Sequence, residues 1–168
     1  MKIFSLLAAT AFVLTSVAAS AIPLPAKTYV MKAGASDMFE TESSKLVQNS
    51  ADQKVASYAN MMISDHAKST DEVKNAAMAD GMTPSAPTMT PKQKAMIDSL
   101  KRTSGAKRDL LYKKDQVVAH QETLAFQKEY AMSGDKPNLK MAAGKIVPVV
   151  QSHLDMAKGM TPMAARMQ

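Results

Sequence analysis

Apolar residues recur at three- and four-residue intervals along most of the chain beyond residue 25, which is the spacing of one face of an α-helix. No segment alternates apolar and polar residues for the length of a strand. The periodic segments are poor in glycine and rich in Ala, Met, Lys, Gln, Glu and Leu, which favour helices most strongly. The pattern therefore predicts an all-α protein.

The pattern divides into four long helices, over about residues 26–49, 52–80, 106–132 and 135–158. Residues that cap or end helices separate them: Ser50 or Asp52, Gly81, the run Ser133-Gly134-Asp135, and Gly159 with Pro162. The third helix would be roughly 40 Å long, and a helix of this kind is stable in water only if it buries one face. Four such helices predict a four-helix bundle.

The connection between the second and third long helices spans about 24 residues. It begins with the turn-rich residues 81–90. A short helix follows, with Thr90 as its N-cap, Pro91 in its first position and Gln93 completing a capping box. A hairpin needs only a few residues, whereas a connection of this length can run back along the bundle. We therefore expect the second and third helices to be parallel, the one-crossover arrangement of a ferritin-like four-helix bundle.

Residues 1–21 have the three parts of a secretory signal peptide. Lys2 gives the positive start, residues 3–17 are largely apolar, and Ala19-Ser20-Ala21 is an A-x-A cleavage site. The apolar stretch is too short to span a membrane, and no second apolar run of spanning length follows. We predict a cleaved signal peptide, a single mature domain over residues 22–168 with its core at about 28–158, and a periplasmic or secreted location without a transmembrane segment.

Composition narrows the classes of function. The chain has no cysteine, which excludes disulfides, thiolate metal sites and thiol catalysis. Cleavage of the predicted signal removes Lys2 and leaves 20 basic and 15 acidic residues, spread without a block of like charge. Nucleic-acid binding is not expected, because there is neither a basic cluster nor interleaved aromatic residues. The excess positive charge is compatible with weak association with an anionic envelope surface.

The three histidines of the chain each interrupt the apolar stripe of a different predicted helix. The stripes follow helical spacing: Val55, Ala59, Met62, His66, Thr70, Val73 and Ala77; Leu110, Val117, His120, Leu124 and Ala131; Leu139, Ala143, Ile146, Val150, His153 and Ala157. Counting along the helices places His66 and His120 at one level. The same count places His153 about 7 Å away along the bundle, although Pro148 would kink its helix.

The first predicted helix has no histidine but carries carboxylates. Glu42 shares a stripe with Met31, Ala35, Met38 and Leu46. Glu40 shares the neighbouring stripe with Ala33, Asp37, Ser44 and Val47, and either carboxylate could point inward. A set made of His66, His120, His153, Glu40 or Glu42, and Asp65 would suit iron, zinc, copper or manganese.

The alternative is that the buried histidines are structural and no cofactor is bound. Neutral rings would then bond to Glu40 or Glu42, Asp65 and tyrosines such as Tyr58 or Tyr112. The Glu-x-x-His signature of ferritin-type di-metal sites is absent, because the residues three positions before the histidines are Ile63, Val117 and Val150. There is also no nucleophile motif or phosphate-binding loop, so enzymatic activity is not indicated.

The chain is rich in methionine, with 15 such residues. Several follow His153: Met156, Met160, Met163 and Met167. Thioethers beside an imidazole would suit Cu(I). Methionine is also a flexible core filler and a good helix former, and the breaks at Gly159 and Pro162 interrupt the spacing, so we interpret this run as packing.

Four segments of the chain carry a further signal: SDMFETESSKL, KVASYANMMISDH, LYKKDQVVAHQETLAF and VPVVQSHL. Together they resemble a bacterial envelope family of unknown function whose members are often labelled outer-membrane proteins. The likeness covers about residues 28–158, and the Asp65-His66 pair is its most specific element. It implies a ferritin-like fold and export, but no particular activity. The family commonly has an acid before the third-helix histidine, where this chain has Ala119.

Two functions are consistent with these observations. The first is a non-enzymatic role in the cell envelope, as a structural, stress-related or interaction protein whose partner the sequence does not name. The second is metal binding by a ferritin-like protein with a histidine and carboxylate site inside the bundle.

Export gives a direct prediction. Protein recovered from the cell envelope should begin near Ile22, because the A-x-A site ends at Ala21. N-terminal sequencing of the purified protein measures this start, and a mature protein that retains Met1 would contradict the prediction.

Overall fold

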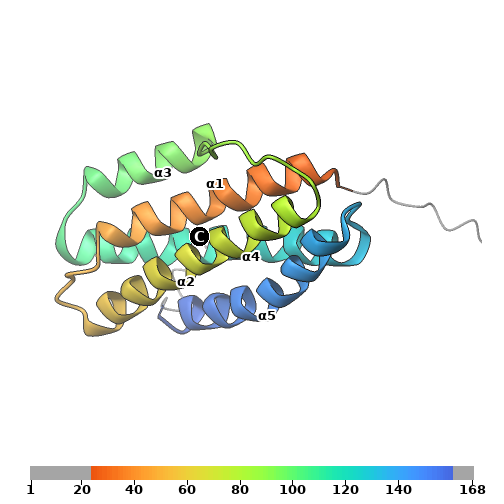
Figure 1. The fold of residues 1–168 in the computed structure, drawn as a ribbon. Coiled ribbons are helices and arrows are strands. Elements are labelled where there is room, and N and C mark those ends of the chain that lie inside the picture. Colours follow the sequence, from red (N-terminus) through yellow and green to blue (C-terminus); the bar gives the residue numbers. More distant parts are fainter. Residues whose placement is uncertain (1–23, 161–168) are drawn as a thin grey trace, which may run out of the picture.

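The computed structural model describes residues 24–160, which form five helices and contain no strand (Figure 1). The helices are α1 (Ala26–Lys45), α2 (Gln53–Ala79), α3 (Pro91–Lys101), α4 (Gly105–Ser133) and α5 (Pro137–Met160). The predicted all-α class is confirmed, and each predicted helix corresponds to one of these. The largest difference in bounds is at α1, which ends at Lys45, four residues before the predicted end.

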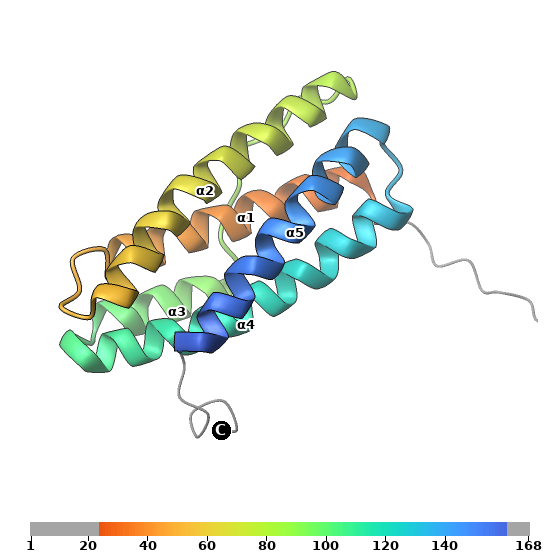
Figure 2. The ribbon, with the colours of Figure 1, turned by 90° about the horizontal axis from the view of Figure 1, so that it is seen from below.

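Helices α1 and α2 form one antiparallel pair and α4 and α5 form another (Figure 2). The two pairs pack so that α2 and α4 run in the same direction, as predicted. The ion pair of Asp52 and Lys113 joins the starts of these helices at 2.8 Å. Helix α1 is antiparallel to α4. The Tyr29 hydroxyl, near the start of α1, donates a hydrogen bond to Gln127 late in α4, and Ser44, near the end of α1, bonds to Tyr112 early in α4.

The connection after α2 carries the chain back to the end of the bundle where α4 begins. Gly81 has a φ of 76°, a left-handed conformation that glycine adopts without strain. Residues 82–90 then cross the bundle, and Thr90 and Gln93 form the predicted capping box of α3. Helix α3 lies against α1 and α4, and Lys92 pairs with Glu122 of α4 (Figure 1).

The buried faces of α2 and α5 agree with their predicted stripes, apart from the exposed Thr70. In α1 the face with Glu40 is buried, while Glu42 is exposed. The predicted stripe of α4 is wrong in part, since Leu110 is 42% exposed. Its true inner face is largely polar and aromatic: Asp109, Tyr112, Gln116, His120, Thr123, Gln127 and Tyr130. Hydropathy did not indicate this face, because its polar members are buried only through partners on other helices.

The apolar core falls into two clusters, one toward each end of the bundle. One contains Tyr29, Val73, Tyr130, Leu139 and Ile146 among others. The second gathers residues near the opposite end: Val47, Val55, Tyr58, Ala59, Met62, Leu100, Tyr112 and Ala157. A layer of buried polar side chains lies between the clusters, and this layer holds the three histidines.

The predicted signal peptide and the residues Pro162, Met163 and Met167 lie outside the described part of the chain. Within residues 24–160, no helix combines the length and apolar character needed to cross a membrane.

Packing of the crossover gives a stability prediction. A Cβ at Gly34 in α1 would lie 2.7 Å from the Cβ of Pro87, so Gly34→Ala must displace the crossover and should cost about 1–3 kcal/mol. Gly144→Ala is the matched control, since nothing lies within 4 Å of its position in α5. Alanine is the better helix former there and should stabilise by about 0.5–1 kcal/mol. Urea denaturation measures the free energy of unfolding of both variants. Equal changes in the two would contradict the close contact between Gly34 and Pro87.

Candidate metal centre

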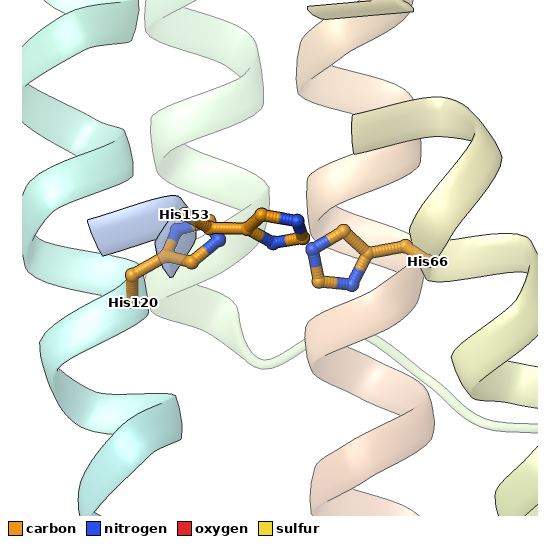
Figure 3. Close-up of side chains that lie close together, drawn as sticks. All are labelled: His66, His120 and His153. Atoms are coloured by element: carbon orange, nitrogen blue, oxygen red, sulfur yellow. The ribbon is translucent and has the colours of Figure 1, made fainter. Parts of the chain in front are cut away.

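The three histidines, which are far apart in sequence, meet at the centre of the bundle. His66 comes from α2, His120 from α4 and His153 from α5, and Figure 3 shows their imidazoles turned toward one another. Their ring centroids are 5.5–5.8 Å apart. One ring nitrogen from each residue lies within 4.8 Å of the others, and the three residues are only 1–4% exposed. Among residues 24–160 these three form the one group with the spacing of metal ligands.

His66 is held by Asp37 of α1. The Nδ1 atom of His66 lies 2.8 Å from Oδ1 of Asp37, and both side chains are almost fully buried. The second carboxylate oxygen of Asp37 accepts a hydrogen bond from the Thr70 hydroxyl at 3.0 Å. Asp37 therefore fixes the orientation of the His66 ring from the side away from the other two histidines.

His120 is held by its own helix. Its Nδ1 lies 2.9 Å from the backbone carbonyl oxygen of Gln116, one turn earlier in α4. A carbonyl can only accept, so Nδ1 carries the proton and Nε2 carries the lone pair. Glu40 approaches the same side of the ring, with Oε1 at 3.6 Å from Nδ1.

His153 is held by Asp65, the residue that precedes His66. The Nε2 atom of His153 lies 3.3 Å from Oδ2 of Asp65. The other oxygen of Asp65 accepts from Lys68 at 2.9 Å, near the surface. The backbone carbonyl of His153 accepts a hydrogen bond from the Tyr58 hydroxyl, so this tyrosine positions the helix rather than the ring.

Each ring thus has one nitrogen with a partner and one without. The unpartnered atoms are Nε2 of His66, Nε2 of His120 and Nδ1 of His153, all completely buried. A neutral imidazole has one donor and one acceptor nitrogen, so a neutral ring whose bonded nitrogen donates keeps its lone pair on the buried nitrogen without a partner. Nitrogens of this kind can bind an electron-pair acceptor such as a metal ion.

The electrostatic environment keeps two of the three rings neutral. Burial, with His66 nearby, lowers the pKa of His120 to about 3 and that of His153 to about 4. Burial also acts to lower the pKa of His66, but the bond to Asp37 and the charge of Glu40 raise it on balance. The cluster as a whole therefore takes up one proton readily, at His66, and resists a second.

The candidate carboxylates of α1 have different positions. Glu40 is 1% exposed, and its Oε2 accepts from Gln116 at 2.6 Å while Oε1 has no hydrogen-bond partner. Burial raises the pKa of Glu40 to about 7. It approaches the bonded side of His120, so it lies beside the three-histidine group. The side chain of Glu42 is 47% exposed and pairs with Lys45 on the surface, so the structure does not bring it to the site.

The estimated offset of His153 along the bundle is too large, and the ring centroids of His120 and His153 are only 5.5 Å apart. His120 lies 13 residues before Ser133, the last residue of α4, and His153 lies 16 residues after Pro137, the first residue of α5. The real difference is three residues, or about 4.5 Å of helix. The reach of two imidazole side chains covers that distance.

Sequence reasoning did not find the supporting role of Asp37 or of Gln116. Asp37 shares the buried stripe of α1 with Glu40, one turn away, and this spacing was the available signal. Gln116 bonds to His120 through its backbone carbonyl. Any residue at that position would supply this carbonyl, so the identity of residue 116 does not reveal the role. Among the methionines after His153, Met156 is 38% exposed and Met160 packs against the second apolar cluster.

Residues 13–160 match the family described as a domain of unknown function (DUF4142), and the chain belongs to this family. No curated protein and no solved structure matches the chain. The assignment confirms that the chain belongs to a family of unknown function, and it gives no activity, location or fold.

The hydrogen bonds predict the tautomers of two histidines. In metal-free protein near neutral pH, His120 should carry its proton on Nδ1 and His153 on Nε2, because their partners are a carbonyl and a carboxylate. Long-range ¹H–¹⁵N NMR spectra distinguish the two tautomers. The reverse assignment at either residue would mean that the lone pair does not face the cluster.

Proposed function

We propose that this protein binds a single transition-metal ion through His66, His120 and His153. The observation that carries the proposal is the set of three buried ring nitrogens without partners, one on each histidine. The opposite nitrogen of each ring is held by a carboxylate or a backbone carbonyl. Metal-binding histidines are typically oriented in this way by a second hydrogen bond.

The donor set limits the choice of ion. Three neutral imidazoles suit zinc, copper, iron or nickel better than calcium or magnesium, which prefer oxygen. At metal–nitrogen distances of about 2.0–2.1 Å, a tetrahedral ion would hold the three nitrogens about 3.4 Å apart. The nitrogens now lie within 4.8 Å of one another, so the longest separation would close by up to about 1.4 Å on binding.

The arrangement of helices supports a ferritin-like bundle. Helices α2 and α4 are parallel and joined by a crossover that contains α3, as in one-crossover bundles. The site differs from the di-metal centre of such folds, because Ile63, Val117 and Val150 occupy the positions where its Glu-x-x-His signature needs glutamate. We therefore propose a ferritin-like scaffold with a mononuclear site.

We also propose that the protein acts outside the cytoplasm. The support is the signal-like pattern of Lys2, the apolar residues 3–17 and Ala19-Ser20-Ala21. The absence of cysteine leaves imidazole as the strongest metal donor of the chain.

A structural, stress-related or interaction role without a metal is the competing proposal. It requires the histidine network to be satisfied by the protein itself. Asp37, Gln116 and Asp65 each bond to one of the two nitrogens of a ring. The Tyr58 hydroxyl bonds to the backbone of His153 and not to its ring. The unpartnered nitrogens therefore favour the metal.

Thermal melts separate the two proposals. Untagged wild-type protein should melt lower with chelator and recover with one specific ion among Zn²⁺, Cu²⁺, Fe²⁺, Ni²⁺ and Mn²⁺, because binding to the folded state adds stability. An ion at 100 times its Kd adds about 2.7 kcal/mol, which corresponds to roughly 8–10 °C for a domain of this size. A wild-type melt that ignores every ion would contradict metal binding.

Two variants sharpen the same experiment. His66→Ala should lose about 2–4 kcal/mol through the cavity and the unpaired Asp37, and its melt should respond neither to chelator nor to metal. Glu42→Gln is the matched control, because this carboxylate is exposed and paired with Lys45, so the wild-type response to metal should persist. A response retained in His66→Ala would place the ion elsewhere.

Acid should weaken binding in a characteristic way. Ligating imidazoles must be neutral, so the ion competes with one proton below the raised pKa of His66. The Kd should rise about tenfold per pH unit in that range, and more steeply only below about pH 4, where His153 also takes a proton. Competition titrations between pH 4 and 8 measure this slope. If instead the Kd rose about a thousandfold per pH unit below pH 6.5, three protons would compete with the ion, as expected for independent, exposed histidines.

A further inference from the structure

A cavity of about 310 Å³ leads from the surface between α2 and α5 to the histidines. His66 and His153 both form part of its wall. Ser36 and Asp37 of α1 and Thr123 and Gln127 of α4 also line it, whereas His120 does not, so the cavity reaches the bundle centre beside His66 and His153. On the outer side it is bordered by Lys68, Glu72, Val149 and Lys145.

The protein ligands leave the proposed ion incomplete. Within residues 24–160, no further histidine, aspartate or glutamate joins the three histidines at the spacing of metal ligands. Glu40 approaches the bonded nitrogen of His120, and Asp37 and Asp65 hold the far nitrogens of the other two rings. Structural zinc sites usually have four protein ligands, whereas sites with three protein ligands complete the shell with water or substrate.

We propose that the fourth position of the ion faces this cavity and binds a small exogenous anion or a water-derived hydroxide. The inference rests on the proposed metal site and adds that the site is open. An open position is what allows a metal centre to act on a bound ligand rather than only to stabilise the fold.

The charges favour an anionic donor of few atoms. Three neutral imidazoles do not reduce the positive charge of the ion, so a lone pair that also carries negative charge binds best at the remaining position. Lys68 and Lys145 lie at the mouth with side chains 74% exposed, each paired with a carboxylate of the rim or wall. Asp37, Asp65 and Glu72 also line the cavity, so the preference for an anion comes from the charge of the ion and not from the lining.

The first experiment uses azide as the probe and the full mature protein loaded with Cu²⁺ or Co²⁺. Wild-type protein should show an azide-to-copper charge-transfer band, or a changed cobalt visible spectrum, that saturates with one azide per ion. Protein that binds the ion but whose spectrum ignores azide would overturn the open site and leave the proposed metal binding intact. Protein that takes up neither ion overturns both.

Variants then test whether the cavity is the route. Ser69→Trp places a large ring in the wall of the cavity on α2 without altering a ligand, and azide affinity should fall at least tenfold while metal content is unchanged. Ser64→Trp is the matched control, because Ser64 is an exposed residue of the same helix that does not line the cavity. It should bind azide as wild type does.

A second blocking variant covers the case in which Ser69→Trp does not fold. Val149→Phe narrows the same cavity from α5, at a side chain that is already 44% exposed. It should also retain the metal and lose azide affinity. Unchanged azide binding in a folded blocking variant would show that the ligand reaches the ion by another path and would overturn the assignment of this cavity.

Discussion

The central constraint on this structure is that polar atoms buried in a helical bundle need partners. Three imidazoles meet between two apolar clusters, and the helices around them supply a partner for one nitrogen of each ring. The remaining nitrogens point into a space with no donor. Burial makes an unpaired polar atom costly, and this cost is the physical basis of the proposed metal site.

The same polar layer fixes how α1 packs against α4. Pairs of polar side chains follow the interface from one end to the other: Tyr29 with Gln127, Ser36 with Thr123, Glu40 with Gln116, and Ser44 with Tyr112. Shifting one helix by a turn would break every pair, and each broken pair would leave buried atoms unsatisfied. Apolar contacts tolerate such shifts more easily. The polar layer therefore sets the register that brings His120 to the level of His66.

The electrostatics of the centre fit a site for a cation. Asp37, Glu40 and Asp65 surround the histidines, and each approaches the side of a ring that is turned away from the shared space. Burial raises the pKa of Glu40 to about 7, so its charge changes near neutral pH. The cavity between α2 and α5 is lined by His66 and His153. In the proposed metal site, the carboxylates would orient the histidines and the cavity would give access to the ion.

Much of the architecture follows from local features of the sequence. The apolar periodicity gave the helices. The capping box at Thr90 gave the start of α3, and the long connection gave the parallel pair of α2 and α4. The inward position of all three histidines also followed from their apolar neighbours, because a residue between buried positions on one helical face is itself buried.

Only the tertiary structure decided which polar groups meet. The sequence left Glu40 and Glu42 as equal candidates, and contact between α1 and α4 buries the first and exposes the second. The inner face of α4 had no apolar signature, and the level of His153 depended on where α4 and α5 begin and end. Helical periodicity reports which residues share a face. Whether a polar residue on that face finds a partner depends on a different helix, which a one-dimensional pattern does not contain.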